Sequence, residues 1–353
     1  MRREGSVLDR LRVPVVQAPL AGGPSTPELA TAAVRAGALG FLAGGYRGAE
    51  ALREDICHVR GAVAGPFGVN LFVPGDGTVD AAEIESYAER VRREAAGVGA
   101  EAGQPAWSDD EWQSKLDVVL AERPAVVSFT FGCPERSLCD ALHGAGVEAW
   151  VTVTEAGEAE QAAGAGADAL VVQGVEAGGH RGSFLDRDGV GEVGMIALLR
   201  LVASRVDLPL VAAGGICDGY AAAAALVAGA RAAQVGTALL DTPEAGTSPA
   251  YREALRLTGP TRLTRAFTGR RARGIVNGFM DRHDAAAPSA YPHVHSLTAP
   301  MRAAARARGD PDLINLWAGQ GHALMPHGVS AEEVIARLAR EIRAALDGAR
   351  ARM

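Results

Sequence analysis

Short apolar runs rich in β-branched residues alternate with alanine-rich stretches between Val13 and Leu240. Runs of this length, bounded by glycine and polar residues, are typical of buried strands. Eight such runs occur: Val13–Leu20, Leu39–Gly44, Phe67–Val73, Ala125–Phe131, Glu148–Thr154, Ala167–Val172, Leu208–Ala213 and Ala232–Leu240.

Stretches with helical character lie between these runs. They include Thr26–Ala36, Asp80–Ala95, Pro134–His143, Glu155–Ala163, Met195–Ser204 and Asp218–Ala228. Several of them run into a glycine, which is a common helix stop where the chain turns back into a strand. Eight strand–helix units in this order predict an α/β fold, specifically a (β/α)8 TIM barrel. A doubly wound sheet is the alternative, but eight parallel strands would then need a reversal point, and the sequence shows no obvious one.

The regular alternation stops between Asp241 and Leu324, where prolines and glycines punctuate the chain. This segment is too long for a plain loop, so we expect a small, mostly helical cap inserted after the eighth strand, over the barrel mouth. The tail Ala331–Ala349 carries an apolar stripe at helical spacing. We therefore predict a barrel with the ligand site in residues 1–240, a cap or substrate domain in 241–324, and a C-terminal helix in 325–353 that closes the barrel.

Composition narrows the class of protein. Hydrophobic residues are 48% and charged residues 22% of the 353 residues, as in ordinary soluble proteins. The net charge of −7 argues against a nucleic-acid partner. No apolar run reaches membrane-spanning length, and the start of the chain lacks the apolar segment of a signal peptide. Four cysteines without CxxC spacing fit a reducing compartment rather than a zinc site or a disulfide framework, so we expect a cytoplasmic protein.

The basic residues are almost all arginines. The one lysine, Lys115, lies in the polar segment Asp109–Lys115, which we expect to be the solvated start of a helix. A Schiff-base mechanism would depend on that lysine alone, so we give it little weight. The arginine-rich run Arg262–Arg273 is expected to be a solvated face, or to contact a negatively charged group or a partner subunit; a homodimer is left open.

The most distinctive strand end is Gln173–Gly182, with the sequence QGVEAGGHRG. Active sites of such barrels lie at the carboxyl ends of the strands. Glycine lets backbone approach a ligand closely, and histidine titrates near neutral pH. A lone loop histidine is more often a surface residue, but among eight histidines only His180 lies in a glycine-rich loop at a predicted strand end. The loop therefore suits a proton-moving site, in which Glu176 either orients His180 or binds backbone.

Two further pairs of residues point to a cofactor. Gly214-Gly215 follows the seventh run and Gly236-Thr237 lies in the eighth, where barrels commonly bind phosphate through backbone N–H groups. Either pair alone could equally well serve only to form a tight turn between strand and helix. Together with Asn70 and Gln173 at other strand ends, they favour a phosphorylated ring cofactor.

Two other motifs have simpler explanations. His293 and His295 form an HxH pair without an obvious third ligand, so we predict no metal site. Gly189–Gly194 matches GxGxxG but follows Asp186–Asp188 instead of a strand, so we interpret it as a chance match in a loop before a helix. A Rossmann nicotinamide site is not supported.

Six motifs, in order along the chain, resemble those of the nitronate monooxygenases, formerly called 2-nitropropane dioxygenases. They are Gln17–Gly23, Gln173–Gly182, Ala212–Ile216, Gln234–Thr237, Thr264–Arg270 with Ala272–Gly274, and Leu316–Gly321. Flavin-dependent enoyl-ACP reductases share the Glu-Ala-Gly-Gly-His core. Gln173, the residues His180–Gly182 and the late motif Leu316–Gly321 favour the nitronate monooxygenases.

The resemblance implies a TIM barrel that carries FMN. The FMN contacts expected from it are Ala18, Pro19, Asn70, Gln173, Gly178, Gly179, Gly214, Gly215, Gln234, Val235, Gly236 and Thr237. It also implies that His180 is the catalytic base, which takes the α-proton of a small nitroalkane. Dioxygen would then oxidise the nitronate through the flavin, giving a carbonyl compound and nitrite. An imidazole suits such proton abstraction, and arginine or backbone donors can hold the nitro oxygens.

Some relatives place a lysine and tyrosines near the active site in their C-terminal part. This chain has no lysine after Lys115, and its only tyrosines in that part are Tyr251 and Tyr291. Two alternatives stay open: an NAD(P)H-dependent enoyl-ACP or quinone reductase, and a flavin-binding biosynthetic protein, either non-catalytic or recruited for another oxidation.

Overall fold

Eight parallel strands form the centre of the molecule. The computed structural model describes residues 5–257 and 259–353. The strands are β1 (Val15–Gln17), β2 (Gly40–Ala43), β3 (Phe67–Phe72), β4 (Val126–Thr130), β5 (Glu148–Val153), β6 (Ala169–Gln173), β8 (Leu210–Ala213) and β9 (Ala232–Val235). Their order in the sheet is β1-β9-β8-β6-β5-β4-β3-β2, and every neighbouring pair is parallel.

The two ends of this sheet meet and nearly close the barrel. Val16 of β1 bridges Leu39 in parallel, and the Gln17 N–H donates to the Leu39 carbonyl at 2.8 Å. The predicted α/β barrel and its eight strands are therefore confirmed. The prediction for the last strand was too long. β9 ends at Val235, because the backbone leaves the extended region at Gly236 (φ −118, ψ −66), and Thr237–Leu239 form the 3-10 turn η2.

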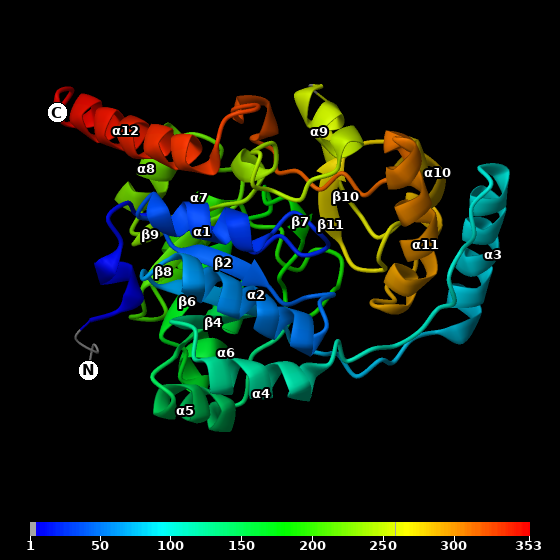
Figure 1. Cartoon of the computed structure of the whole chain (residues 1–353), viewed down its shortest axis with the longest axis horizontal. Helices are drawn as coiled ribbons and strands as arrows, with labels where there is room; N and C mark the ends of the chain where they lie inside the picture. Colours follow the sequence, from blue (N-terminus) through cyan, green and yellow to red (C-terminus); the bar gives the residue numbers. More distant parts are fainter. Residues whose placement is uncertain (1–4, 258) are drawn as a thin grey trace.

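Helices cover the outside of the barrel (Figure 1). They are α1 (Pro27–Arg35), α2 (Ala49–Ala62), α4 (Trp112–Glu122), α5 (Arg136–Gly144), α6 (Ala156–Ala165), α7 (Met195–Ala203), α8 (Gly219–Val227) and α12 (Ala331–Arg350). The apolar stripe of α12 packs between α8 and α1, and a capping box of Ser330 and Glu333 starts the helix. The C-terminal helix thus takes the eighth helical position around the barrel.

A second hydrophobic cluster lies beside the barrel. It contains α9 (Pro249–Arg256), α10 (Gly278–His283) and α11 (His293–Arg308), together with 3-10 turns near residues 284, 311 and 322. The helix α3 (Ala81–Gly97) leaves the barrel and packs against α11, which Figure 1 shows at the side away from α5 and α8. We call this assembly the cap. The sequence pattern did not predict that α3 belongs to the cap. Only tertiary packing joins α3 to α11, which lies about two hundred residues later in the chain.

A small antiparallel sheet connects the cap to the barrel. Strands β10 (Thr261–Thr264) and β11 (Ala272–Ile275) pair with each other, and β11 also pairs with β7 (Gly179–His180). β7 is part of the loop that follows β6, so His180 lies at the junction of barrel and cap. A two-residue strand has no periodicity, so the sequence did not predict it.

No helix in the described residues is long and apolar enough to cross a membrane.

Candidate functional site

A cavity of about 640 Å³ lies between the barrel mouth and the cap. Nearly all of the predicted site residues line it: Ala18, Pro19, Asn70, Gln173, Gly178, Gly179, His180, Gly214, Gly215, Gln234, Gly236 and Thr237. Val235 does not, because its side chain is fully buried between the barrel and the outer helices. The residues therefore come together from β1, β3, β6, β8 and β9, as expected for the carboxyl ends of barrel strands.

Backbone donors are available at the ends of β8 and β9. In the described part of the chain, the N–H groups of Gly215 and Gly236 donate to no protein acceptor, and both residues line the cavity. Unpaired backbone N–H groups at such strand ends are suited to an anion such as a phosphate.

Asn70 presents an acceptor to the same cavity. Its Nδ2 donates to the Ser128 carbonyl at 3.2 Å, to Ser128 Oγ at 3.0 Å and to Thr130 Oγ1 at 3.0 Å. These bonds fix the amide, so that its Oδ1 remains for a ligand donor.

Gln173 braces the His180 loop. Its Nε2 donates to the His180 carbonyl at 3.0 Å, and its Oε1 accepts from the Gly182 N–H at 2.8 Å. One amide hydrogen stays free for a further acceptor. The side chain thus has a structural role in the protein beyond the cofactor contact expected for it.

Arg181 holds the same loop from behind. It is fully buried, and it donates to the carbonyls of Gly174 at 2.6 Å, Gln173 at 2.8 Å and Gly191 at 2.8 Å. Glu176 accepts from the Met195 N–H at 3.0 Å, at the start of α7. Of the two roles considered for Glu176, the structure supports the backbone contact, and a carboxylate is favourable at a helix N-terminus.

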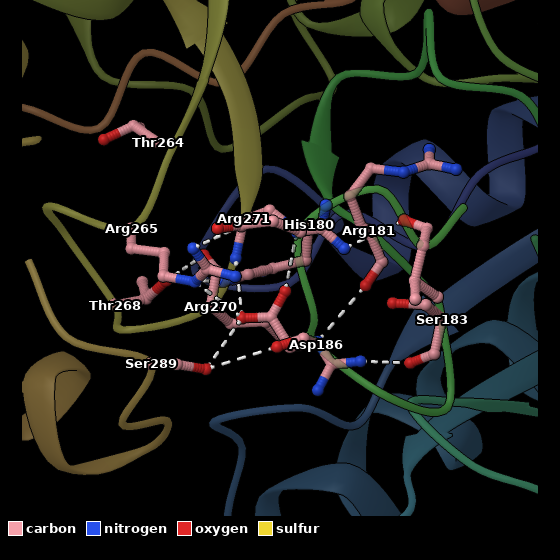
Figure 2. Close-up of polar contacts among 12 residues, drawn as sticks. His180, Arg181, Ser183, Asp186, Thr264, Arg265, Thr268, Arg270, Arg271 and Ser289 are labelled. Carbon is pink, nitrogen blue, oxygen red and sulfur yellow. Dashed lines mark hydrogen bonds and ion pairs between the residues drawn. The ribbon is translucent and has the colours of Figure 1, made fainter. Parts of the chain in front are cut away.

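Of the alternatives for Arg262–Arg273, contact with a negatively charged group is confirmed, and a solvated face is wrong for the second half of the run. Arg270, Arg271 and Arg273 are buried. Figure 2 shows Arg265 and Arg271 converging on Asp186, with Nε–Oδ distances of 3.0 and 2.9 Å. Burial raises the pKa of Asp186, but Arg270, Arg271 and Arg265 outweigh it and lower the pKa overall. The cap arginines therefore fasten the loop that follows His180.

Arg270 extends the contacts between the cap arginines and this loop toward the cavity. It donates to the carbonyls of Arg181 and Ser183, and its guanidinium carbon lies 4.0 Å from the centre of the Phe131 ring. Burial lowers the pKa of Arg270.

His180 is enclosed by aromatic rings. Its ring centre lies 5.6 Å from that of Phe131 and 5.7 Å from those of Tyr291 and Trp317. Its Nε2 lies 2.9 Å from Thr268 Oγ1. Burial, with the nearby Arg270 and Arg302, lowers the pKa of His180 to about 3. The imidazole is therefore neutral at physiological pH, with one ring nitrogen that carries no hydrogen.

Two cationic residues of the cavity were not predicted. Arg302 is 4% exposed and donates to Thr298 Oγ1 at 3.0 Å, to Asn315 Oδ1 at 3.2 Å and to the His295 carbonyl at 3.1 Å. Within residues 5–257 and 259–353, neither Arg302 nor Arg306 pairs with a carboxylate. Burial and Arg306 lower the pKa of Arg302 to about 10. The available signal was two arginines one helical turn apart in an otherwise small and apolar segment.

A tyrosine pair was also missed. The hydroxyls of Tyr46 and Tyr291 lie 3.0 Å apart, and Tyr46 stacks on His295 with ring centres 4.0 Å apart. Burial raises the pKa of both tyrosines, so they stay protonated and can donate hydrogen bonds. The tyrosine expected in the C-terminal part thus acts with a partner from the barrel, because the cap folds back over the strand ends.

Lys115 is not part of a solvated helix start, as the sequence suggested. It is 2% exposed in α4, and its Nζ lies 2.7 Å from Asp110 Oδ2. Asp110 also accepts from the Tyr46 N–H at 3.1 Å. The pair therefore supports the turn that carries Tyr46 into the cavity.

The HxH pair and the GxGxxG match are the two remaining motifs. His295 contacts Arg302, with 3.2 Å between its Nδ1 and Nη2. The described residues contain no group of three or more histidine, cysteine, aspartate or glutamate side chains arranged to hold a metal. The Gly189–Gly194 segment is a loop that ends at the start of α7.

Comparisons with known proteins agree with this arrangement. Residues 7–341 match the family model described as nitronate monooxygenase. A nitronate monooxygenase from Pseudomonas aeruginosa is 42% identical over 348 residues, covering 94% of this chain and 97% of that protein. Among solved structures, a nitroalkane oxidase from Streptomyces ansochromogenes is 45% identical with a TM-score of 0.93, covering 97% of this chain and 99% of that one. FabK from Thermotoga maritima is 26% identical, with a TM-score of 0.77 and 98% coverage of both chains.

Proposed function

The chain belongs to the nitronate monooxygenase family, and we propose that it binds FMN at the barrel mouth and uses dioxygen to oxidise nitronates to a carbonyl compound and nitrite. We further propose that it takes neutral nitroalkanes through a prior proton abstraction by His180. The observation that carries the second step is the neutral, buried imidazole of His180 in the same cavity as the guanidinium of Arg302, which has no carboxylate partner among the described residues.

The residues at the strand ends fit a flavin mononucleotide. The unpaired N–H groups of Gly215 and Gly236 suit its phosphate, and Asn70 Oδ1 offers an acceptor to its polar ring edge. Gly178, Gly179, Gly214, Gln234 and Thr237 complete the lining on this side. When bound, the flavin would supply the electron acceptor for the nitronate and the route by which dioxygen is reduced.

The protein's own residues would handle the proton and the charge. His180 takes the α-proton of the nitroalkane, the C–H electron pair moves onto the nitro group, and the nitronate carries the negative charge. Arg302 lowers the pKa of His180 and would stabilise that charge in a site shielded from water. The protonated hydroxyls of Tyr46 and Tyr291 provide further donors on the aromatic side of the cavity.

The test compares two substrates in one variant. We expect His180→Asn to retain flavin and to lose turnover of a neutral nitroalkane by about a hundredfold or more, because general base catalysis contributes about 10²–10⁴. Turnover of the preformed nitronate should fall much less, since no proton needs to be removed. His58→Asn, a change at an exposed histidine of α2, is the matched control and should behave as wild type on both substrates. Equal losses on both substrates would contradict the role of His180 as base.

A further inference from the structure

Thr268 was part of a sequence motif to which no role was assigned, yet among residues 5–257 and 259–353 it makes the one polar contact to the His180 ring. Its side chain is fully enclosed at the turn between β10 and β11, and its Oγ1 lies 2.9 Å from His180 Nε2 and 3.2 Å from the Arg270 carbonyl oxygen. The rings of Phe131, Tyr291 and Trp317 occupy other sides of the imidazole. The protonation state of Nε2 therefore depends on which way the hydroxyl points.

The hydroxyl has one hydrogen and two neighbours. The Arg270 carbonyl can only accept, and in the described residues no other donor reaches it. If the hydroxyl donated to His180, this carbonyl would be left unpaired in a buried position, which costs about 1–3 kcal/mol. The hydroxyl therefore donates to the carbonyl, and its oxygen accepts a hydrogen from His180 Nε2.

We infer that Thr268 is a positioning residue that holds neutral His180 as the Nε2–H tautomer, so that Nδ1 is the atom that takes the substrate proton. Nδ1 has no hydrogen-bond partner in the described part of the protein and is not among its enclosed polar atoms, so it faces the cavity that His180 lines. The substrate C–H bond breaks and its electron pair stays on the nitronate. The new N–H bond forms at Nδ1, while Nε2–H continues to donate to Thr268.

The same chain of bonds supports the imidazolium that results. Nε2–H donates to a hydroxyl that is itself polarised by a carbonyl oxygen, which strengthens the bond when the ring becomes positive. The charged groups that act on the ring are Arg270 and Arg302, which disfavour the cation, and Asp186, which favours it. The Thr268–Arg270 contact thus offsets part of the repulsion in the free protein, and the bound nitronate would offset more.

The inference uses the proposed base role of His180, but its primary test does not depend on turnover. ¹⁵N NMR of the flavin-loaded protein labelled at histidine distinguishes protonated from unprotonated ring nitrogens, and His180→Asn identifies the His180 signals. We expect Nε2 to carry the hydrogen in the wild type and in Thr268→Ser. In Thr268→Val, which removes the hydroxyl with little change of shape, the preference for Nε2–H should be lost. Thr264→Val is the control: Thr264 ends β10, four residues before Thr268, and its hydroxyl donates to Asp284 Oδ1 at 2.7 Å. This change should leave the His180 signals unchanged.

Kinetics give a second readout. Thr268→Val should reduce turnover of neutral nitroalkane about tenfold or more relative to its effect on preformed nitronate, and Thr268→Ser should restore it. A wild-type ring with its hydrogen on Nδ1, or an unchanged tautomer in Thr268→Val, would overturn the inference even if the protein oxidises nitronates. A protein that shows the Nε2–H tautomer but oxidises no nitronate would instead refute the proposed function.

Discussion

Gly178 shows how closely the cap approaches the Gln173–Gly182 loop. An added Cβ there would lie 2.5 Å from the carbonyl carbon of Ala318 and the amide nitrogen of Gly319. Carbon atoms in contact prefer separations of about 3.5–4.0 Å. Because both obstructing atoms are backbone, no side chain can turn away. Gly178→Ala must therefore push the loop and the Leu316–Gly321 motif apart by about 1 Å.

The expected loss follows from this displacement. Overpacking of this kind costs about 1–3 kcal/mol. With an unfolding entropy of about 2.1 cal/mol/K per residue over 353 residues, the melting temperature should fall by about 1–4 °C. His180 lies two residues further on, and a misplacement of about 1 Å can reduce turnover about a hundredfold. Activity should thus suffer far more than stability.

Thermal unfolding, flavin content per chain and turnover of a neutral nitroalkane measure these effects together. Gly157→Ala in α6 is the matched control, because the same methyl meets no atom within 4 Å on an exposed helix face. It should stabilise the protein by at most about 1 kcal/mol, because Gly157 lies in the first turn of α6, and it should leave turnover unchanged. A Gly178→Ala protein with wild-type melting temperature and turnover would refute the close approach described here.

Three further outcomes are expected. Arg302→Leu should raise the KM for nitronates about tenfold to a hundredfold in steady-state kinetics, since a hydrogen bond to a charged group contributes about 1.5–3 kcal/mol; an unchanged KM would exclude Arg302 from anion binding. The pKa of His180 is lowered to about 3, and that of His295 lies well below its usual value. Below about pH 6.5, these two histidines therefore bind protons in the unfolded chain but stay neutral in the folded protein. Stability should therefore decline as the pH falls from about 6.5 toward 3, and the melting temperature of His180→Asn should depend less steeply on pH over that range. Lys115→Met leaves Asp110 without its cation and should destabilise by about 3 kcal/mol in chemical unfolding, whereas the double change with Asp110→Asn should recover part of this loss; no recovery would mean that the two residues do not act as a pair.

The regular part of the fold could be read from the sequence because each strand and helix carries its own periodicity. The runs that became β3 and β5 matched their predicted bounds within one residue. The glycine-rich strand ends also predicted where a ligand would lie, since parallel strands in a barrel end on one face.

What the sequence could not reveal depends on contacts between distant segments. Nothing near α3 indicates that it packs on α11, and nothing near Thr268 indicates that its hydroxyl reaches His180 eighty-eight residues away. A solvated position was expected for Lys115 and was one of the alternatives for Arg270, because long charged residues are usually exposed. They are buried here because the cap and the loops enclose them with acceptors and a carboxylate.

Anaerobic mixing of the flavin-loaded protein with a preformed nitronate, and separately with NADH or NADPH, tests the central claim most directly. Loss of the oxidised flavin absorbance with the nitronate, and its return with the formation of nitrite when dioxygen is admitted, is the predicted result. Rapid bleaching by reduced nicotinamide but not by the nitronate would contradict it and would favour a reductase.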